Sequence, residues 1–217
     1  AIIWVHGGPV GQTRPVFRPD IQMLLAEGFA VLLPNVRGSS GYGRAYAQSD
    51  DLHLRPDCVA DLRHGRDWLA AHPAVDATRI GIMGQSYGGY MVNAAITEHP
   101  NLWKAAVNYY GIVDFVTTLD GTGPWRRSHR AAEYGDPVRH AELFRQISPI
   151  HRIDAVRVPV LAAHGLRDPR VPIGESEQLV EALRDRQRKV TYLTFDYAGH
   201  GFIRPDDKRR IYVAVAE

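Results

Sequence analysis

Short apolar runs alternate along the chain with stretches in which apolar residues recur at helical spacing. The first two runs are apolar throughout, which is typical of strands buried on both faces of a sheet. The predicted strands are residues 1–5, 29–33, 80–83, 105–107, 158–163 and 190–195. The stretches between and after them predict helices near residues 21–25, 57–71, 91–96, 175–184 and 206–217. Strands that alternate with helices indicate an α/β fold with a mostly parallel sheet and helices on both faces.

Two stretches of this pattern lead to more detailed expectations. In the predicted helix 57–71, the side chains expected to face the core are those of Val59, Leu62, Trp68 and Leu69. Residues 117–150 contain few apolar repeats and predict an irregular segment, which at this place in the chain would form a cap or wall over a site.

A tight turn at Ser86 joins a predicted strand to a predicted helix. Residues 84–88 are G-Q-S-Y-G, so Ser86 lies at the apex of a G-x-S-x-G sequence. A nucleophilic serine needs such a sharp turn, in which side chains at Gly84 and Gly88 would collide with the neighbouring strand and helix. The following helix directs its N-terminus at the serine, so the Tyr87 backbone N–H is expected to face a developing oxyanion.

Two further turns follow predicted strands and offer partners for the serine. A serine hydroxyl needs a base, for which histidine is suited, and an acid must then fix the tautomer of the histidine. The order Ser86, Asp168, His200 is the serine, acid, histidine order of α/β hydrolases. Asp196 is a rival acid, but it lies so close to His200 in sequence that we expect it to share the histidine's loop rather than reach its far nitrogen.

The first predicted strand ends in the sequence His6-Gly7-Gly8-Pro9. Two glycines at the carboxyl end of a parallel strand allow backbone N–H groups to turn toward a ligand. A similar H-G-G segment supplies part of the oxyanion hole in lipases and esterases, so we expect the same role for this loop. His6 lies inside the loop and before the serine, and is expected to be structural.

Composition narrows the classes of function. The 217 residues have a net charge of +2, which is too mild and too scattered to indicate nucleic-acid binding, and Arg126-Arg127 and residues 208–210 are interpreted as solvated surface. The single cysteine, Cys58, excludes an internal disulfide and a cysteine-based metal cluster, and we expect neither metal nor cofactor. No run has the apolar length of a membrane span and no signal peptide is visible, so we expect no membrane partner and a cytoplasmic location.

Five motifs in register resemble the catalytic domain of prolyl oligopeptidase-type serine peptidases, most closely the acylaminoacyl peptidase and dipeptidyl-peptidase branch. The motifs are H-G-G-P at 6–9, N-x-R-G-S-x-G-Y-G at 35–43, G-x-S-Y-G-G-Y at 84–90, H-G-x-x-D-x-x-V-P at 164–172 and G-H-G-F at 199–202. The resemblance implies that Ser86 is the nucleophile, Asp168 the acid and His200 the base. It also implies an oxyanion hole formed by the backbone of Tyr87 and Gly8.

We therefore expect a serine hydrolase that cleaves short peptides or N-acylated peptides through an acyl-enzyme. A carboxylesterase acting on small acyl esters uses the same machinery and is the alternative, because the sequence does not reveal the substrate pocket. A non-catalytic binding protein of this fold is disfavoured, since such proteins usually lack a member of the triad and all three are present here.

The resemblance also leads to an expectation about domain organisation. Family members usually carry a β-propeller before this domain, and residues 1–217 do not include one. In the strand order that the resemblance implies, strand 1–5 lies between strands 29–33 and 80–83, so the outer edge of 29–33 has no partner. We expect an α/β-hydrolase catalytic domain that is incomplete at both ends within a longer polypeptide, with a homo-oligomer as a further possibility.

Overall fold

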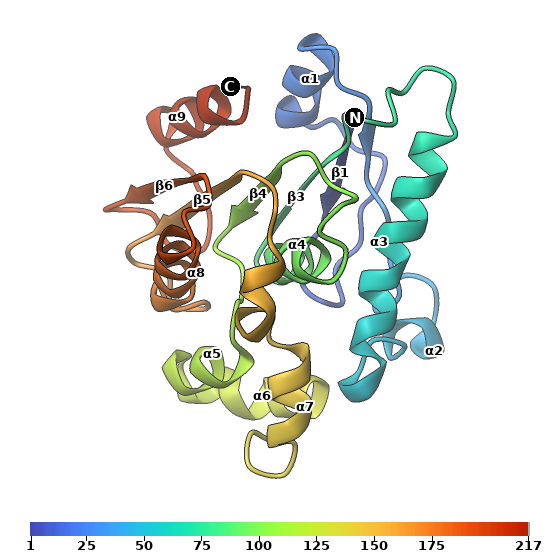
Figure 1. Cartoon of the computed structure of the whole chain (residues 1–217). Helices are drawn as coiled ribbons and strands as arrows, with labels where there is room; N and C mark the ends of the chain where they lie inside the picture. The colour runs from blue at the N-terminus through green and yellow to red at the C-terminus, as the bar shows by residue number, and fades with distance from the viewer. Residues whose placement is uncertain (217) are drawn as a thin grey trace.

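The computed structural model describes residues 1–216, which form one sheet of six strands with helices on both faces (Figure 1). The strands are β1 Ile2–Val5, β2 Val31–Leu32, β3 Gly81–Gln85, β4 Ala106–Tyr109, β5 Val160–Gly165 and β6 Val190–Phe195. Their order in the sheet is β2-β1-β3-β4-β5-β6, and each neighbouring pair is parallel. This arrangement confirms the predicted α/β-hydrolase fold and the predicted place of β1 between β2 and β3.

The helices cover the two faces of the sheet unequally. They are α1 Pro19–Ala26, α2 Arg44–Ala47, η1 Leu52–Leu54, α3 Arg55–Ala70, α4 Tyr87–Glu98, α5 Phe115–Gly121, α6 Pro124–Tyr134, α7 Ala141–Ile147, η2 Pro149–Ala155, α8 Gly174–Asp185 and α9 Pro205–Ala216. Helices α3, α4 and α8 share one apolar core with Ile3 and Val5 of β1, whereas α1 and α9 share another with Ile2 and Trp4. Successive side chains of a strand point to opposite faces, so the buried β1 contributes to both cores. None of the helices within residues 1–216 is long and apolar enough to cross a membrane.

The strand predicted at residues 29–33 is shorter and less buried than expected. Only Val31 and Leu32 form β2, and both side chains are half-buried. Its place at the end of the sheet accounts for the partial burial, since it pairs with β1 alone and has no second partner within residues 1–216.

The prediction of an irregular segment over residues 117–150 was wrong. Helices α5, α6 and α7 occupy most of it and gather at one end of the molecule, away from α1 and α9 (Figure 1). Each helix is short and buries few large side chains, so the apolar repeat that reveals a helix is nearly absent; the buried aromatic and aliphatic residues are Phe115, Leu119, Tyr134, Phe144 and Ile147.

This group of helices is fastened to the rest of the domain by a buried carboxylate at the start of α8. Glu175 Oε2 accepts hydrogen bonds from the backbone N–H groups of Val113 and Asp114, each at 2.9 Å, and its Oε1 accepts from Thr117 at 2.5 Å. Because Glu175 is almost fully buried, these bonds fix the point at which the chain enters α5.

Trp68 does not belong to the core-facing set of α3, and its side chain is 61% exposed. It follows Leu62 by six residues, which turns it by roughly 120° around a helix from the buried stripe. The stripe is formed instead by Cys58, Val59, Leu62 and Leu69.

Candidate active site

Ser86 lies on a strained turn between β3 and α4. Its backbone has φ 58° and ψ −122°, and its N–H donates to the carbonyl of Tyr109 at 2.9 Å. A Cβ atom on Gly84 would lie 2.3 Å from the Gly88 carbonyl oxygen, and one on Gly88 would lie 2.3 Å from that of Val5. Both glycines are therefore required for the close approach of the turn to β1 and α4, as predicted.

The turn brings the serine hydroxyl into a chain of hydrogen bonds with two residues that follow β5 and β6. His200 Nε2 lies 2.8 Å from Ser86 Oγ, and His200 Nδ1 lies 2.6 Å from Asp168 Oδ2. The three residues that the sequence selected are thus in mutual contact at the carboxyl edge of the sheet. The rival, Asp196, is exposed, and its carboxylate has no hydrogen bond to His200.

The Asp168 carboxylate is fully buried and is held on both oxygens. Its Oδ1 accepts the backbone N–H groups of Arg170 and Val171 at 2.8 and 3.0 Å, while Oδ2 accepts from His200. Burial alone would oppose ionisation, but the neighbouring rings of His164 and His200 and the Arg170 backbone N–H outweigh it and hold the pKa of Asp168 below its ordinary value. An ionised carboxylate only accepts, so His200 Nδ1 carries the proton and Nε2 offers its lone pair to the serine hydroxyl.

Two aromatic side chains for which the sequence analysis predicted no role lie beside this chain of hydrogen bonds. His164 is fully buried, with Nδ1 2.7 Å from Ser176 Oγ and Nε2 3.5 Å from Asp168 Oδ2. The ring of Tyr110 lies 4.7 Å from that of His200, and its backbone has a positive φ of 41°. His164 belongs to the quoted H-G-x-x-D motif, which could have drawn attention to it, whereas nothing in the sequence pattern marks Tyr110.

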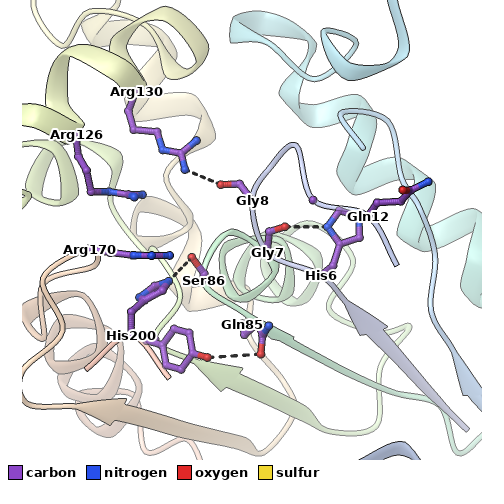
Figure 2. A pocket seen from close by; sticks show the side chains of 12 residues that line it. His6, Gly7, Gly8, Gln12, Gln85, Ser86, Arg126, Arg130, Arg170 and His200 are labelled. Carbon is purple, nitrogen blue, oxygen red and sulfur yellow. Dashed lines mark hydrogen bonds between the residues drawn. The ribbon is translucent and has the colours of Figure 1, made fainter. Parts of the chain in front are cut away.

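The loop after β1 runs beside the elbow. A Cβ on Gly7 would lie only 3.2 Å from Ser86 Cβ, and Gly8 has a φ of +147° that favours glycine. The Gly7 carbonyl oxygen is 2.9 Å from His6 Nδ1, and the C=O and N–H of a trans peptide point in opposite directions. The Gly8 N–H is therefore directed away from His6, toward the side on which Ser86 lies (Figure 2).

His6 has the structural role that the sequence suggested. Its Nε2 lies 2.9 Å from Ser39 Oγ, which ties the loop after β1 to the loop after β2. Burial lowers the pKa of His6, so its ring is neutral near neutral pH.

The N-terminus of α4 supplies a second backbone N–H group, that of Tyr87, next to Ser86. Tyr87 is the first residue of this helix, and the N–H groups in the first turn of a helix have no acceptor within it. Tyr87 adjoins Ser86 at the start of the helix, and the expectation that its N–H and that of Gly8 form an oxyanion hole stays a prediction.

A cavity of about 430 Å³ opens above the serine. Its lining residues come from the loop after β1, the elbow, helix α6 and the loops after β4, β5 and β6; they are His6, Gly7, Gly8, Gly11, Gln12, Gln85, Ser86, Tyr110, Arg126, Arg130, Arg170 and His200. The interpretation of Arg126 as solvated surface was wrong, because α6 turns this side chain into the cavity wall (Figure 2). The predicted wall over the site is therefore present, and it is helical.

Comparison with known proteins agrees with this geometry. Residues 15–217 match the sequence profile of the prolyl oligopeptidase family. Dipeptidyl aminopeptidase BIII of Pseudoxanthomonas mexicana is 32% identical over 213 residues, which are 96% of this chain and 31% of the relative.

Solved structures are similar over nearly the whole chain. A Mycobacterium tuberculosis puromycin-hydrolyzing peptidase has a TM-score of 0.94 and 31% identity, covering 99% of this chain and 33% of that one. An acylaminoacyl peptidase in complex with Z-Gly-Gly-Phe-chloromethyl ketone has a TM-score of 0.90 and 30% identity, covering 99% and 35%. The chain thus spans about a third of the length of these relatives.

The sheet order, the elbow serine and the family profile define the class of the chain as an α/β-hydrolase-fold protein. The chain belongs to the prolyl oligopeptidase family.

Proposed function

We propose that the chain cleaves short peptides or N-acylated peptides by acyl transfer, with Ser86 as nucleophile, His200 as base and Asp168 as the orienting acid. The observation that carries this proposal is the continuous hydrogen-bond chain from Ser86 Oγ through His200 to Asp168. The names of the relatives, a dipeptidyl aminopeptidase and an acylaminoacyl peptidase, support peptides as the substrate class.

In the first half of the reaction, Ser86 Oγ forms a bond to the carbonyl carbon while its proton passes to His200 Nε2. The buried Asp168 carboxylate stabilises the imidazolium that forms. The negative charge that develops on the carbonyl oxygen is stabilised by the N–H groups of Tyr87 and Gly8. The C–N bond then breaks, and His200 gives its proton to the leaving amine.

In the second half, water attacks the ester carbon of the acyl-enzyme. His200 Nε2 takes a proton from this water, the bond between the carbon and Ser86 Oγ breaks, and the proton returns to the serine. The acid product leaves and the starting state is restored.

Replacement of the nucleophile tests the proposal. Ser86→Ala is expected to abolish turnover of dipeptidyl and N-acetyl-aminoacyl anilides and covalent labelling by a fluorophosphonate, which needs the serine oxygen. The melting temperature should change little, because the hydroxyl contributes little packing. Labelling that persists in Ser86→Ala would exclude Ser86 as the nucleophile.

A p-nitrophenyl acyl ester assayed on the same preparation separates the two substrate classes. Both substrates should be cleaved, because an ester has the better leaving group and places a smaller demand on the same machinery. Turnover of the ester alone would replace the peptidase proposal with the carboxylesterase alternative.

A further inference from the structure

The cavity above Ser86 has an unusual balance of charge. Three arginines line it, Arg126, Arg130 and Arg170, and none of its lining residues is an aspartate or a glutamate. Figure 2 shows the guanidinium groups of Arg126 and Arg170 directed toward Ser86 and His200. The site therefore presents positive charge to whatever occupies it.

The guanidinium of Arg126 has no anionic partner. Within residues 1–216 it makes no ion pair and no hydrogen bond, and its nearest aromatic neighbour is the ring of Trp125, with 5.5 Å between the guanidinium carbon and the ring centre. Burial, and then the positive charge of Arg130, lower the pKa of Arg126. A half-buried cation without an anionic partner is stabilised by an anion placed beside it.

Arg130, one helical turn along α6, is already engaged. It forms an ion pair with Glu133, and its Nη2 donates to the Gly8 carbonyl oxygen at 2.8 Å. The helix is held from its other side by Arg55, whose Nη2 donates to the Glu133 carbonyl oxygen at 3.0 Å. Arg126 is thus presented to the cavity by a helix that is tied to the rest of the domain, so its charge is placed before a ligand arrives.

The hydrogen bond from Arg130 to the Gly8 carbonyl oxygen indicates which part of a substrate would reach α6. Arg130 binds the carbonyl of Gly8, the residue whose N–H is proposed to hold the substrate oxyanion. The attacked carbonyl would therefore lie beside the loop that the Arg130 side chain ties to α6. The substrate group that we place against the helix is the side chain of the residue that carries this carbonyl.

We propose that the cavity selects peptides in which the residue on the acyl side of the cleaved bond is acidic, aspartate or glutamate, with Arg126 as the specificity-determining residue. This inference rests on the proposed role of Ser86. A carboxylate side chain would accept charge-assisted hydrogen bonds from the guanidinium, in the geometry that favours arginine over lysine. A neutral amide of the same shape would leave the cation without an anionic partner, and a basic side chain would be repelled by Arg126 and Arg170.

A matched pair of substrates measures the preference. N-acetyl-Glu p-nitroanilide and N-acetyl-Gln p-nitroanilide have the same shape and differ only in charge. The natural protein is expected to show a kcat/KM for the Glu substrate about 10- to 100-fold above that for the Gln substrate, the range that one hydrogen bond to a charged group supplies. A ratio at or below one would overturn the inference.

Substitutions at Arg126 assign the preference to this residue. Arg126→Met should bring the ratio of kcat/KM for the Glu and Gln substrates close to one, and Arg126→Lys should retain part of the preference. Arg126→Glu should reverse the charge preference, so that N-acetyl-Lys p-nitroanilide is cleaved better than the Glu substrate. Arg139→Met is the control, because it removes the same charge from an exposed position outside the cavity and should keep the ratio of the natural protein. An unchanged ratio in a folded Arg126→Met protein would overturn the assignment.

The same measurements separate this inference from the proposed function. If neither anilide is cleaved and the fluorophosphonate does not label Ser86, the proposed function fails and the inference fails with it. If labelling and turnover are present but the two anilides are cleaved equally, the nucleophile stands and only the acidic specificity is wrong.

Discussion

At the scale of single residues, the hydrogen bonds of the Asp168 carboxylate distinguish it from Asp196, the other acid considered as a partner of His200. Its Oδ1 is occupied by two backbone N–H groups, so only Oδ2 is free to face the histidine. An asparagine at this place would keep an oxygen on the backbone donors and present its NH₂ group to Nδ1. The imidazole would then be held in the tautomer that has no lone pair for the serine proton.

Asp168→Asn is therefore expected to lower kcat by about 10⁴-fold, the loss seen for the equivalent change in a serine protease. Asp196→Asn is the matched control, since Asp196 is exposed and has no hydrogen bond to His200. Steady-state kinetics of both variants on one anilide provide the measurement. If Asp196→Asn is the more damaging change, the acid has been assigned to the wrong residue.

At the scale of elements, helices α3, α4 and α6 meet at a buried group of polar side chains. Arg55, at the start of α3, pairs with Asp50 and donates to the Tyr87 hydroxyl, and all three side chains are fully or almost fully buried. The Tyr87 hydroxyl in turn donates to Asp50 Oδ2 at 2.8 Å. Tyr87, the residue after Ser86, is thus held through its side chain by the first residue of α3.

Asp50 is the titrating member of this group. Burial raises its pKa to about 6 from an ordinary 3.8, although Arg55 and the Tyr87 hydroxyl act in the opposite direction. The folded state then binds the proton more tightly than the unfolded state between these two pH values. The stabilisation from this proton is fully present below pH 3.8 and is lost as the pH rises through 6.

Asp50→Asn keeps the shape of the side chain but removes its ionisable group. The variant should therefore not lose this stabilisation as the pH rises. The free energy of unfolding of the variant, minus that of the natural protein, is expected to rise by up to about 3 kcal/mol between pH 4 and pH 7, at 1.36 kcal/mol per pKa unit. Denaturant unfolding at several pH values measures the difference, in which the effects of other carboxylates cancel. A difference that stays constant over this range would contradict the prediction.

At the scale of the whole molecule, the outer edge of β2 has no strand partner within residues 1–216. It presents unpaired backbone groups and half-buried apolar side chains, within a chain that spans about a third of the length of its relatives. Open apolar edges promote association between copies. The expectation that further strands cover this edge in a longer polypeptide stays a prediction.

Residues 1–217 expressed alone should accordingly self-associate, and Ala30→Lys should shift the product toward monomer. Ala30 is exposed and immediately precedes β2, so a lysine there adds a charge at the edge without entering the core. Size-exclusion chromatography with light scattering, over a series of concentrations, tests both proteins. A monomer at high concentration from the natural sequence would show that the edge does not drive association.

The sequence by itself determined the fold class and the serine turn, and the family resemblance supplied the place of β1 between β2 and β3. The first two features depend on local patterns, namely the apolar runs of β1 and β3, the helical repeat of α4, and the glycines on either side of Ser86. The choice of Asp168 over Asp196 also came from the sequence, because a residue so near His200 in the same loop is poorly placed to reach its far nitrogen.

The tertiary structure alone decided what surrounds the serine. Helices α5 to α7 bury few apolar residues each, so the spacing of apolar residues gives little sign of them, and their position depends on distant anchors such as Glu175. The inward direction of Arg126 follows from the packing of α6 against Arg55 and the Gly8 loop, and the outward direction of Trp68 follows from the packing of α3. Such orientations arise from contacts between residues far apart in the chain, which no local pattern records.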